Sequence, residues 1–136
     1  MRPLFLLMFL LTTKSSGNDI SCDWKKFGDF YYKMFQEEKS WLEADQACKG
    51  EGGELTSVPS KEVDKFLSGY KGPFWIGGDD FEEPGTFKWK DGTDFVYQNW
   101  VGGKPKKDGG NCISKSSKGW LVKSCGETQT FVCHLS

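Results

Sequence analysis

Five cysteines constrain this chain more strongly than any other feature of its sequence. They lie at Cys22, Cys48, Cys112, Cys125 and Cys133. In an oxidising compartment such cysteines predict disulfides, and their odd number leaves at least one without an intrachain partner. Their spacing alone does not choose the pairing. Zinc binding is the weaker alternative, because the chain has no Cys-x-x-Cys motif and a single histidine, His134.

The first residues of the chain predict that oxidising compartment. Residues 1–3 carry a positive charge, residues 4–11 (LFLLMFLL) are uninterrupted and apolar, and residues 12–17 turn polar and small. This order is typical of a secretory signal peptide, and the apolar run is too short to cross a bilayer. We therefore expect a signal peptide at residues 1–17, a mature domain at residues 18–136, and a secreted, extracellular protein with no membrane span.

Charge and motif content exclude two classes of function. The formal net charge is −1 at pH 7, so the whole-chain charge predicts no nucleic-acid partner. The adjacent Glu82 and Glu83 precede Pro84 and Gly85, a pattern of a solvated turn and not of a glycosidase acid pair. No phosphate-binding loop is present, and Ser-His-Asp chemistry would depend on His134. We expect the protein not to be an enzyme.

Hydrophobic patterning in the first half of the chain predicts one strand and two helices. The aromatic residues 27–35 predict a strand, and the polar residues 36–39 predict a turn. Ser40 and Glu43 then match a capping box at the start of a helix. Ser60 begins a second helix, in which residues 63, 66, 67 and 70 form an apolar face at helical spacing.

The second half of the chain predicts short strands around one long loop. Residues 74–78 (FWIGG) form a bounded apolar run, which is typical of a buried strand. Its Gly77 and Gly78 indicate close approach of another backbone, or a bend. Residues 112–114, 119–122 and 130–133 predict three more strands. Residues 101–111 are rich in Gly, Lys and Pro without periodicity, and such long loops in compact domains usually carry function.

Taken in order, these features resemble the C-type lectin-like domain over almost the whole mature chain. The resemblance implies an α+β double-loop fold, with two helices, two small antiparallel sheets and a long loop between them, stabilised by disulfides. The residues that carry it are Trp41, Ala44, Cys48, Trp75, Ile76, Gly77, Phe87, Lys88, Trp89, Asp91, Gly92, Tyr97, Asn99, Trp100, Gly102, Pro105, Asn111, Cys112, Gly119, Trp120, Cys125, Phe131, Val132 and Cys133.

The same resemblance implies a disulfide pairing. It joins Cys48 to Cys133, which ties the first helix to the last strand, and Cys112 to Cys125, which closes the base of the long loop. Cys22 is left over.

Long-form members of the family have an N-terminal hairpin with its own disulfide. In this chain the second cysteine of that hairpin is replaced, near Phe30. Cys22 is therefore either a free thiol or the bridge to a second chain. An exposed free thiol is a liability in a secreted protein, which favours a disulfide-linked homodimer.

The resemblance also locates a calcium site whose ligands are missing. Sugar-binding members hold calcium with a Glu-Pro-Asn or Gln-Pro-Asp triplet and a Trp-Asn-Asp triplet. The matching triplets are Lys104-Pro105-Lys106 and Trp120-Leu121-Val122, which lack the oxygen ligands that calcium needs. Asp80 and Asp108 match part of a second family site. We expect no cofactor and no calcium at the sugar site, with Asp80 and Asp108 as the weak metal candidates.

A lysine-rich stretch occupies the region of the missing site. Its residues are Lys104, Lys106, Lys107, Lys115, Lys118 and Lys123, with Asp108 as the one acid between them. These lysines predict a basic face that attracts sulfated or acidic glycans, anionic surfaces or acidic extracellular proteins, with an affinity that falls with salt. An equally simple alternative is a solvated loop whose charge maintains solubility.

Two functions follow. The first is a secreted, non-catalytic recognition module that binds a carbohydrate or an anionic surface, without the calcium-coordinated sugar site. The alternative is a calcium-independent protein-binding member of the same fold that acts as a disulfide-linked dimer, since many family members without calcium ligands bind proteins.

Overall fold

The computed structural model describes residues 23–136 of the chain. The expected signal peptide and Cys22 lie outside the described residues. The described chain contains two α-helices and eight strands, and a short 3-10 helix, η2, forms the start of the long loop. Their bounds are β1 (Lys25–Phe27), β2 (Phe30–Lys39), α1 (Trp41–Gly50), β3 (Glu54–Leu55), α2 (Lys61–Leu67), β4 (Phe74–Asp79), β5 (Lys88–Trp89), η2 (Val101–Gly103), β6 (Cys112–Ser116), β7 (Gly119–Lys123) and β8 (Gln129–Leu135).

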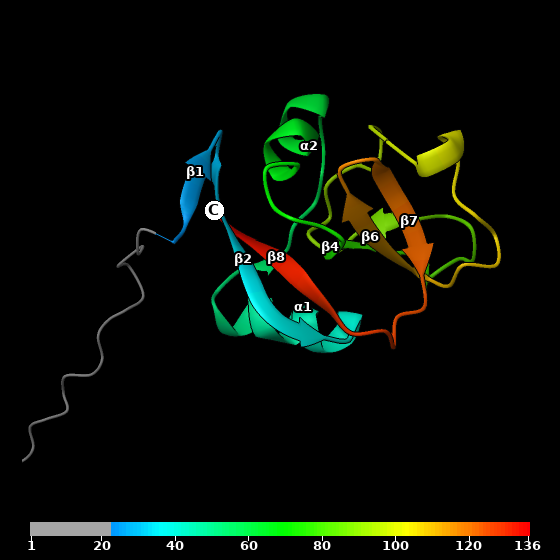
Figure 1. The fold of residues 1–136 in the computed structure, drawn as a ribbon, viewed down its shortest axis with the longest axis horizontal. Coiled ribbons are helices and arrows are strands. Elements are labelled where there is room, and N and C mark those ends of the chain that lie inside the picture. The colour runs from blue at the N-terminus through cyan, green and yellow to red at the C-terminus, as the bar shows by residue number, and fades with distance from the viewer. Residues whose placement is uncertain (1–22) are drawn as a thin grey trace, which may run out of the picture.

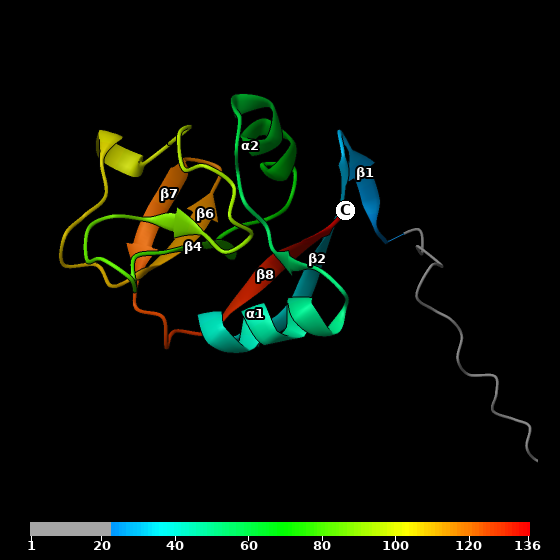
Figure 2. The same cartoon turned by 180° about the vertical axis from the view of Figure 1, so that it is seen from behind.

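The strands form one mixed sheet with the order β1-β2-β8-β4-β6-β7, while β3 pairs with β8 and β5 pairs with β4. The expected α+β class with two helices is confirmed. The two antiparallel halves are not separate, however, because β4 runs parallel to β8, with Phe74 opposite Thr130 and Trp75 opposite Phe131. This contact makes β4 and β8 the centre of the molecule. Helices α1 and α2 lie on either side of β8 (Figures 1 and 2).

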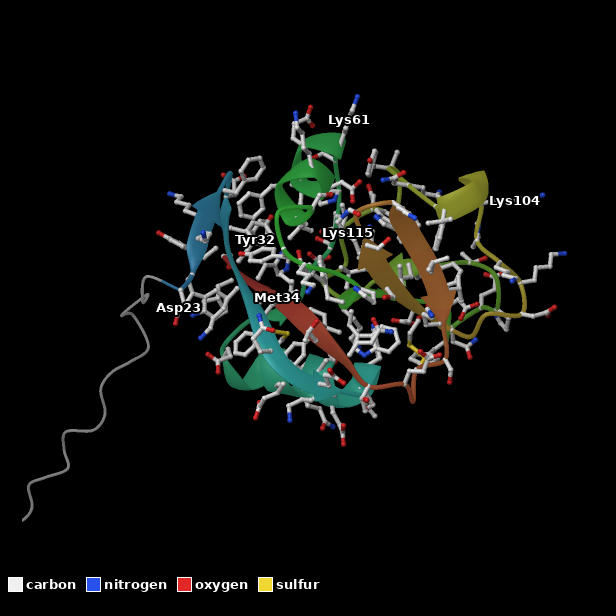
Figure 3. All side chains as sticks on the ribbon, viewed as in Figure 1. Asp23, Tyr32, Met34, Lys61, Lys104 and Lys115 are labelled. Carbon is white, nitrogen blue, oxygen red and sulfur yellow. A yellow bond between two sulfur atoms is a disulfide. The ribbon has the colours of Figure 1, made fainter. Side chains whose placement is uncertain are left out.

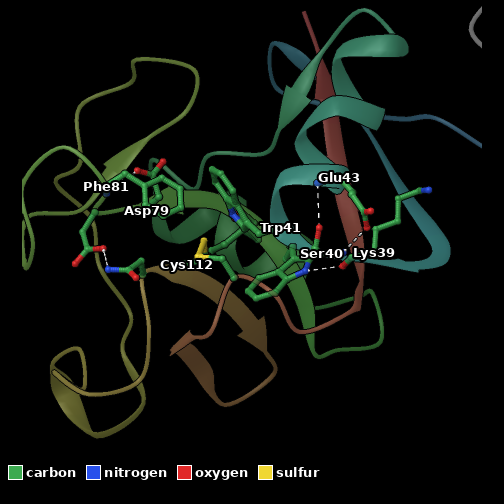
Figure 4. The surroundings of a disulfide bond; sticks show 12 residues. Lys39, Ser40, Trp41, Glu43, Asp79, Phe81 and Cys112 are labelled. Carbon is green, nitrogen blue, oxygen red and sulfur yellow. Dashed lines mark hydrogen bonds between the residues drawn. A yellow bond between two sulfur atoms is a disulfide. The ribbon is translucent and has the colours of Figure 1, made fainter.

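Helix α1 begins with the capping box that the sequence predicts. The Ser40 hydroxyl accepts a hydrogen bond from the Glu43 amide (3.3 Å), and the Glu43 carboxylate accepts one from the Ser40 amide (3.2 Å). Trp41 is the first residue of the helix, and its indole N–H donates to the Ile76 carbonyl (2.9 Å). Figure 4 shows Ser40, Glu43 and Trp41 near Cys112. The cap therefore positions the side chain that anchors α1 to β4.

Strand β2 is longer than the sequence predicts. The expected turn at residues 36–39 is wrong, because β2 continues to Lys39, which lies opposite Gln129 of β8 after an irregularity in register. Glu37 and Glu38 are exposed in this part of the strand. Their charge looks like that of a turn, but pairing with β8 decides the local conformation.

Both disulfides form as the family resemblance implies. Cys48 of α1 is bonded to Cys133 of β8, and Cys112 of β6 is bonded to Cys125 in the segment before β8. Gly77 lies beside the backbone of β3, where an added Cβ would come within 2.4 Å of the Leu55 carbonyl oxygen. The expected close approach at this glycine is therefore confirmed.

Candidate functional site

The long loop of residues 101–111 lies against β7 at both ends. At its start, the Trp120 amide donates to the Asn99 carbonyl (2.7 Å), and Trp100 forms an isolated bridge with Trp120. At its end, an added Cβ on Gly110 would lie 2.2 Å from the Lys123 carbonyl oxygen. Strand β7 thus lies beside the loop from its start to its end. The loop forms the end of the molecule that lies away from β1 (Figures 1 and 2).

A hollow of about 490 Å³ lies between the long loop and the segment that follows β4. Phe87 is buried, whereas Lys104, Lys106 and Lys107 are exposed. The hollow therefore combines an apolar interior with a positively charged rim. Its lining residues are Asp80, Pro84, Gly85, Phe87, Lys104, Pro105, Lys106, Lys107, Gly110 and Asn111.

Asp80 holds the two walls of the hollow together. One of its carboxylate oxygens accepts a hydrogen bond from the Asn111 side chain, and the other accepts one from the Gly85 amide, both at 2.8 Å. Asp80 is buried, whereas Asp108, the other predicted metal candidate, is exposed. Within residues 23–136, no three His, Cys, Asp or Glu side chains are grouped so that they could hold a metal. The absence of calcium stays a prediction.

Five of the six predicted lysines lie on or beside the long loop. Lys104, Lys106 and Lys107 line the hollow. Lys118 is exposed in the turn between β6 and β7, next to the start of the loop, and Lys123 ends β7, next to Gly110. The structure therefore gathers these five cations along β7 and the loop above it.

Lys115 is the exception, and its predicted place on the basic face is wrong. Its side chain is 1% exposed, and its ammonium lies 2.9 Å from the Asp64 carboxylate and 3.1 Å from the Ser68 hydroxyl. Figure 3 shows Lys104 extending outward at the end of the molecule, while Lys115 lies within it. The reason is the position of β6 between two other strands, where α2 supplies a buried carboxylate for this one lysine.

Asp64 accepts four hydrogen bonds, a role that the sequence analysis missed. Its Oδ1 atom accepts from Lys115 and from the Trp120 indole (3.0 Å), and its Oδ2 atom accepts from Tyr97 (3.0 Å) and Asn99 (2.7 Å). This cluster joins α2 to the segment before the long loop and to β6 and β7. The sequence signal that could have identified Asp64 is an acidic residue on the apolar face of α2, three residues before Leu67.

The Asp64 cluster shifts the pKa values of its members. Burial alone would raise the pKa of the Asp64 carboxyl, but hydrogen bonds from Lys115, Trp120 and Asn99 outweigh it and lower the pKa below its usual range. Burial and the hydrogen bond to Asp64 raise the pKa of Tyr97 to about 12. Asp64 is therefore a permanent anion at neutral pH, and it compensates Lys115 in the interior.

A second buried cluster surrounds the single histidine. The imidazole Nε2 of His134 lies 3.3 Å from the Asp91 carboxylate, and the Ser57 hydroxyl donates to the same oxygen (2.7 Å). Burial raises the pKa of Asp91, but hydrogen bonds from His134, Ser57 and Thr93 lower it far below its usual range. Ser57 donates to Asp91 and not to His134. The hydroxyl that does lie near His134, Thr56 Oγ1 at 3.5 Å from Nδ1, is buried and donates to the Ser57 carbonyl (2.7 Å). Neither hydroxyl is therefore an accessible nucleophile beside the imidazole.

Comparisons with known proteins agree with this geometry. Residues 37–135 match the profile of the Lectin C-type domain family. Snaclec 5 from Bitis arietans is 34% identical over 138 residues, which cover 94% of this chain and 91% of that protein. C-type lectin lectoxin-Lio1 from Erythrolamprus poecilogyrus is 31% identical over 144 residues, with coverage of 94% and 88%.

Solved structures extend the comparison to the fold. The cow C-type carbohydrate-recognition domain of CD23 matches with a TM-score of 0.79 and 30% identity, covering 86% of this chain and 95% of that one. A calcium-independent type II antifreeze protein matches in fold, with a TM-score of 0.80, 24% identity, and coverage of 87% and 95%. None of the helices in residues 23–136 is long and apolar enough to cross a membrane. The chain belongs to the C-type lectin domain family and is a non-catalytic recognition domain of that family.

Proposed function

We propose that this protein is a secreted recognition module that binds acidic or sulfated glycans, without calcium, through a basic long-loop face. This face consists of Lys104, Lys106, Lys107, Lys118 and Lys123. The observation that carries the proposal is the hollow of about 490 Å³, which has three exposed lysines at its rim and the buried Phe87 below them. Secretion is supported by the signal-peptide pattern at residues 1–17 and by the two disulfides.

The hollow suits a ligand that is anionic on one side and apolar on the other. Lysine ammonium groups attract sulfate or carboxylate groups as mobile point charges. Phe87, Pro84 and Pro105 offer apolar surface to the C–H face of a sugar ring. Binding that depends on several exposed lysines weakens as ionic strength rises, because salt screens their charges.

Calcium-independence is supported by the residues at the hollow. Lys104 and Lys106 line it, and the family resemblance matches both of them to positions of oxygen ligands. Both carboxylate oxygens of Asp80 already accept hydrogen bonds from within the protein. The matching antifreeze protein is described as calcium-independent, which supports the view that the fold itself does not require the ion.

Binding of the mature, disulfide-bonded protein to a heparin-type oligosaccharide tests the proposal. We expect binding by titration calorimetry that is unchanged by a chelator and weaker at higher salt. The K104Q/K106Q/K107Q variant is expected to lose binding, whereas K61Q/K65Q/K71Q, which removes the same charge from exposed lysines elsewhere, is expected to keep it. Binding abolished by the chelator, or no binding of sulfated and carboxylated glycans, would overturn the proposal.

A second candidate is a calcium-independent protein-binding module that acts as a homodimer linked through Cys22. All four cysteines of the described chain are used in its two disulfides, so an oxidised Cys22 would have to pair with another molecule. Gel electrophoresis with and without reductant decides this point. A dimer that the C22S variant abolishes supports the candidate, and a monomer with one titratable thiol removes it.

A further inference from the structure

We infer that the Lys106–Lys107 pair is a processing site for a trypsin-like serine protease, and that the cut weakens the basic long-loop face. The first half of this inference depends only on the fold and the sequence. The second half rests on the proposed function, because it concerns the affinity of that same face.

The backbone around Lys106 and Lys107 is available to a protease. Lys106, Lys107 and Asp108 are exposed, and no helix or strand lies between η2 and β6. The Gly109 amide closes a single turn on the Lys106 carbonyl at 3.3 Å. Proteases bind their substrates as extended strands through main-chain hydrogen bonds, so exposed loop tips of this kind are preferred sites of cleavage.

Two other lysine sites are less suitable. The second Lys-Lys pair, Lys25–Lys26, lies in β1, where the two residues are paired with Tyr32 and Tyr31. A protease reaches that backbone only after β1 separates from β2. Lys104 precedes Pro105, whose nitrogen carries no hydrogen and is held in a ring, so the bond after Lys104 is a poor substrate.

The reaction is a hydrolysis that consumes one water. The protease adds water to the Lys106 carbonyl carbon, the bond to the Lys107 nitrogen breaks, and the products are a carboxylate on Lys106 and an ammonium group on Lys107. Cleavage one residue later, after Lys107, gives the same kinds of chain end. No oxidant or reductant takes part.

The disulfides determine what remains after the cut. Cys48 lies in the first fragment and Cys133 in the second, so this bond links the fragments, whereas Cys112 and Cys125 both lie in the second fragment. Strand pairing also crosses the cut, since β6 pairs with β4 and β8 pairs with β2. The product is therefore a folded, two-chain form held by the Cys48–Cys133 bond.

The cut changes the rim of the hollow directly. Lys104 and Lys106 end up on one fragment and Lys107 on the other, so the loop no longer holds the three lysines at a fixed spacing. A new carboxylate stands beside them and competes with an anionic ligand. We expect the affinity for a sulfated oligosaccharide to fall about tenfold, the loss typical of one charge-assisted contact.

Limited digestion of the mature, disulfide-bonded protein with trypsin tests the processing site. We expect the first cut, mapped by mass spectrometry, to fall after Lys106 or Lys107, and the two fragments to separate on a gel only with reductant. The K106Q/K107Q variant is expected to lose this early cut, and the matched K25Q/K26Q variant to keep it. A first cut elsewhere, or fragments that separate without reductant, would overturn the inference.

Oligosaccharide binding before and after this digestion tests the switch. A nicked protein that binds as tightly as the intact one would overturn the second half of the inference. If the intact protein does not bind the oligosaccharide, the proposed function fails, and the digestion map still decides whether Lys106–Lys107 is a processing site.

Discussion

The Lys115 ammonium lies 2.9 Å from the Asp64 carboxylate, and both side chains are buried, so an ion pair joins β6 to α2 in the interior of the domain. Neither charge could be tolerated there alone, because an isolated buried ion loses its hydration without compensation. The same carboxylate accepts bonds from Trp120, Tyr97 and Asn99. The start of the long loop is therefore positioned by an electrostatic contact that lies outside the loop.

Removing one member of this pair should destabilise the protein strongly. We expect Lys115→Met to lower the free energy of unfolding by about 3–5 kcal/mol, because the buried Asp64 carboxylate loses its cationic partner. The double variant D64N/K115M should lose less than the sum of the two single variants, since no charge is then buried. Urea denaturation measures these changes. A Lys115→Met variant as stable as the wild type would contradict the proposed role of the pair.

Acidification should destabilise the domain through Asp91 and Asp64. Hydrogen bonds outweigh burial and lower the pKa of both carboxyls in the folded state, so the unfolded state takes up their protons first as pH falls. Their contribution to stability is complete above the unfolded pKa of about 4 and is lost as pH falls from about 5 through the lowered folded values. Thermal melting between pH 7 and pH 2 should show this loss, with a smaller slope in Asp91→Asn. An identical slope in that variant would argue against it.

The two disulfides should differ in their effect on stability. The Cys48–Cys133 bond spans 85 residues and the Cys112–Cys125 bond spans 13. Because a longer closed loop restricts the unfolded chain more, we expect C48A/C133A to lower the free energy of unfolding by about 4–5 kcal/mol and C112A/C125A by about 3 kcal/mol. Guanidinium denaturation of the two double variants compares them directly. The opposite order would show that native-state contacts around Cys112, and not chain entropy, dominate.

Gly110 and Gly102 form a matched pair for testing how the long loop is anchored. Both have positive φ, but an added Cβ on Gly110 would lie 2.2 Å from the Lys123 carbonyl oxygen, while the space around Gly102 is open. We expect Gly102→Ala to cost about 1–2 kcal/mol from backbone strain alone. Gly110→Ala adds overpacking against β7 and should cost about 3–4 kcal/mol. Equal losses in chemical denaturation would show that the loop end moves freely away from β7.

Local sequence signals predicted a large part of this fold. The capping box at Ser40 and Glu43 depends on neighbouring residues, and it is present as predicted. The disulfide pairing followed from the family resemblance, since spacing alone left it open. The strand at residues 36–39 was missed because its pairing with β8 involves residues about ninety positions away, a non-local contact that polar composition cannot report.

Prediction of the candidate site from sequence is limited in the same way, because contacts between distant residues decide its structure. The six lysines were selected from composition, and five of them lie on or beside the long loop, while their role in binding stays a prediction. Lys115 could not be distinguished from the others, because its environment depends on its ion pair with Asp64 of α2, which is fifty-one residues earlier in the chain. The hollow itself depends on the contact between Asp80 and Asn111, which no local pattern predicts.

The way the long loop is held at Trp100 and Gly110 has an evolutionary consequence. The bridge at Trp100 and the close packing at Gly110 both involve β7, so we expect the residues between them to change without altering the scaffold. Substitution or replacement of residues 104–108 alters the chemistry at the tip while the interior, the disulfides and both helices keep their contacts. We therefore expect a domain of this kind to change its ligand through a few adjacent codons without losing its fold.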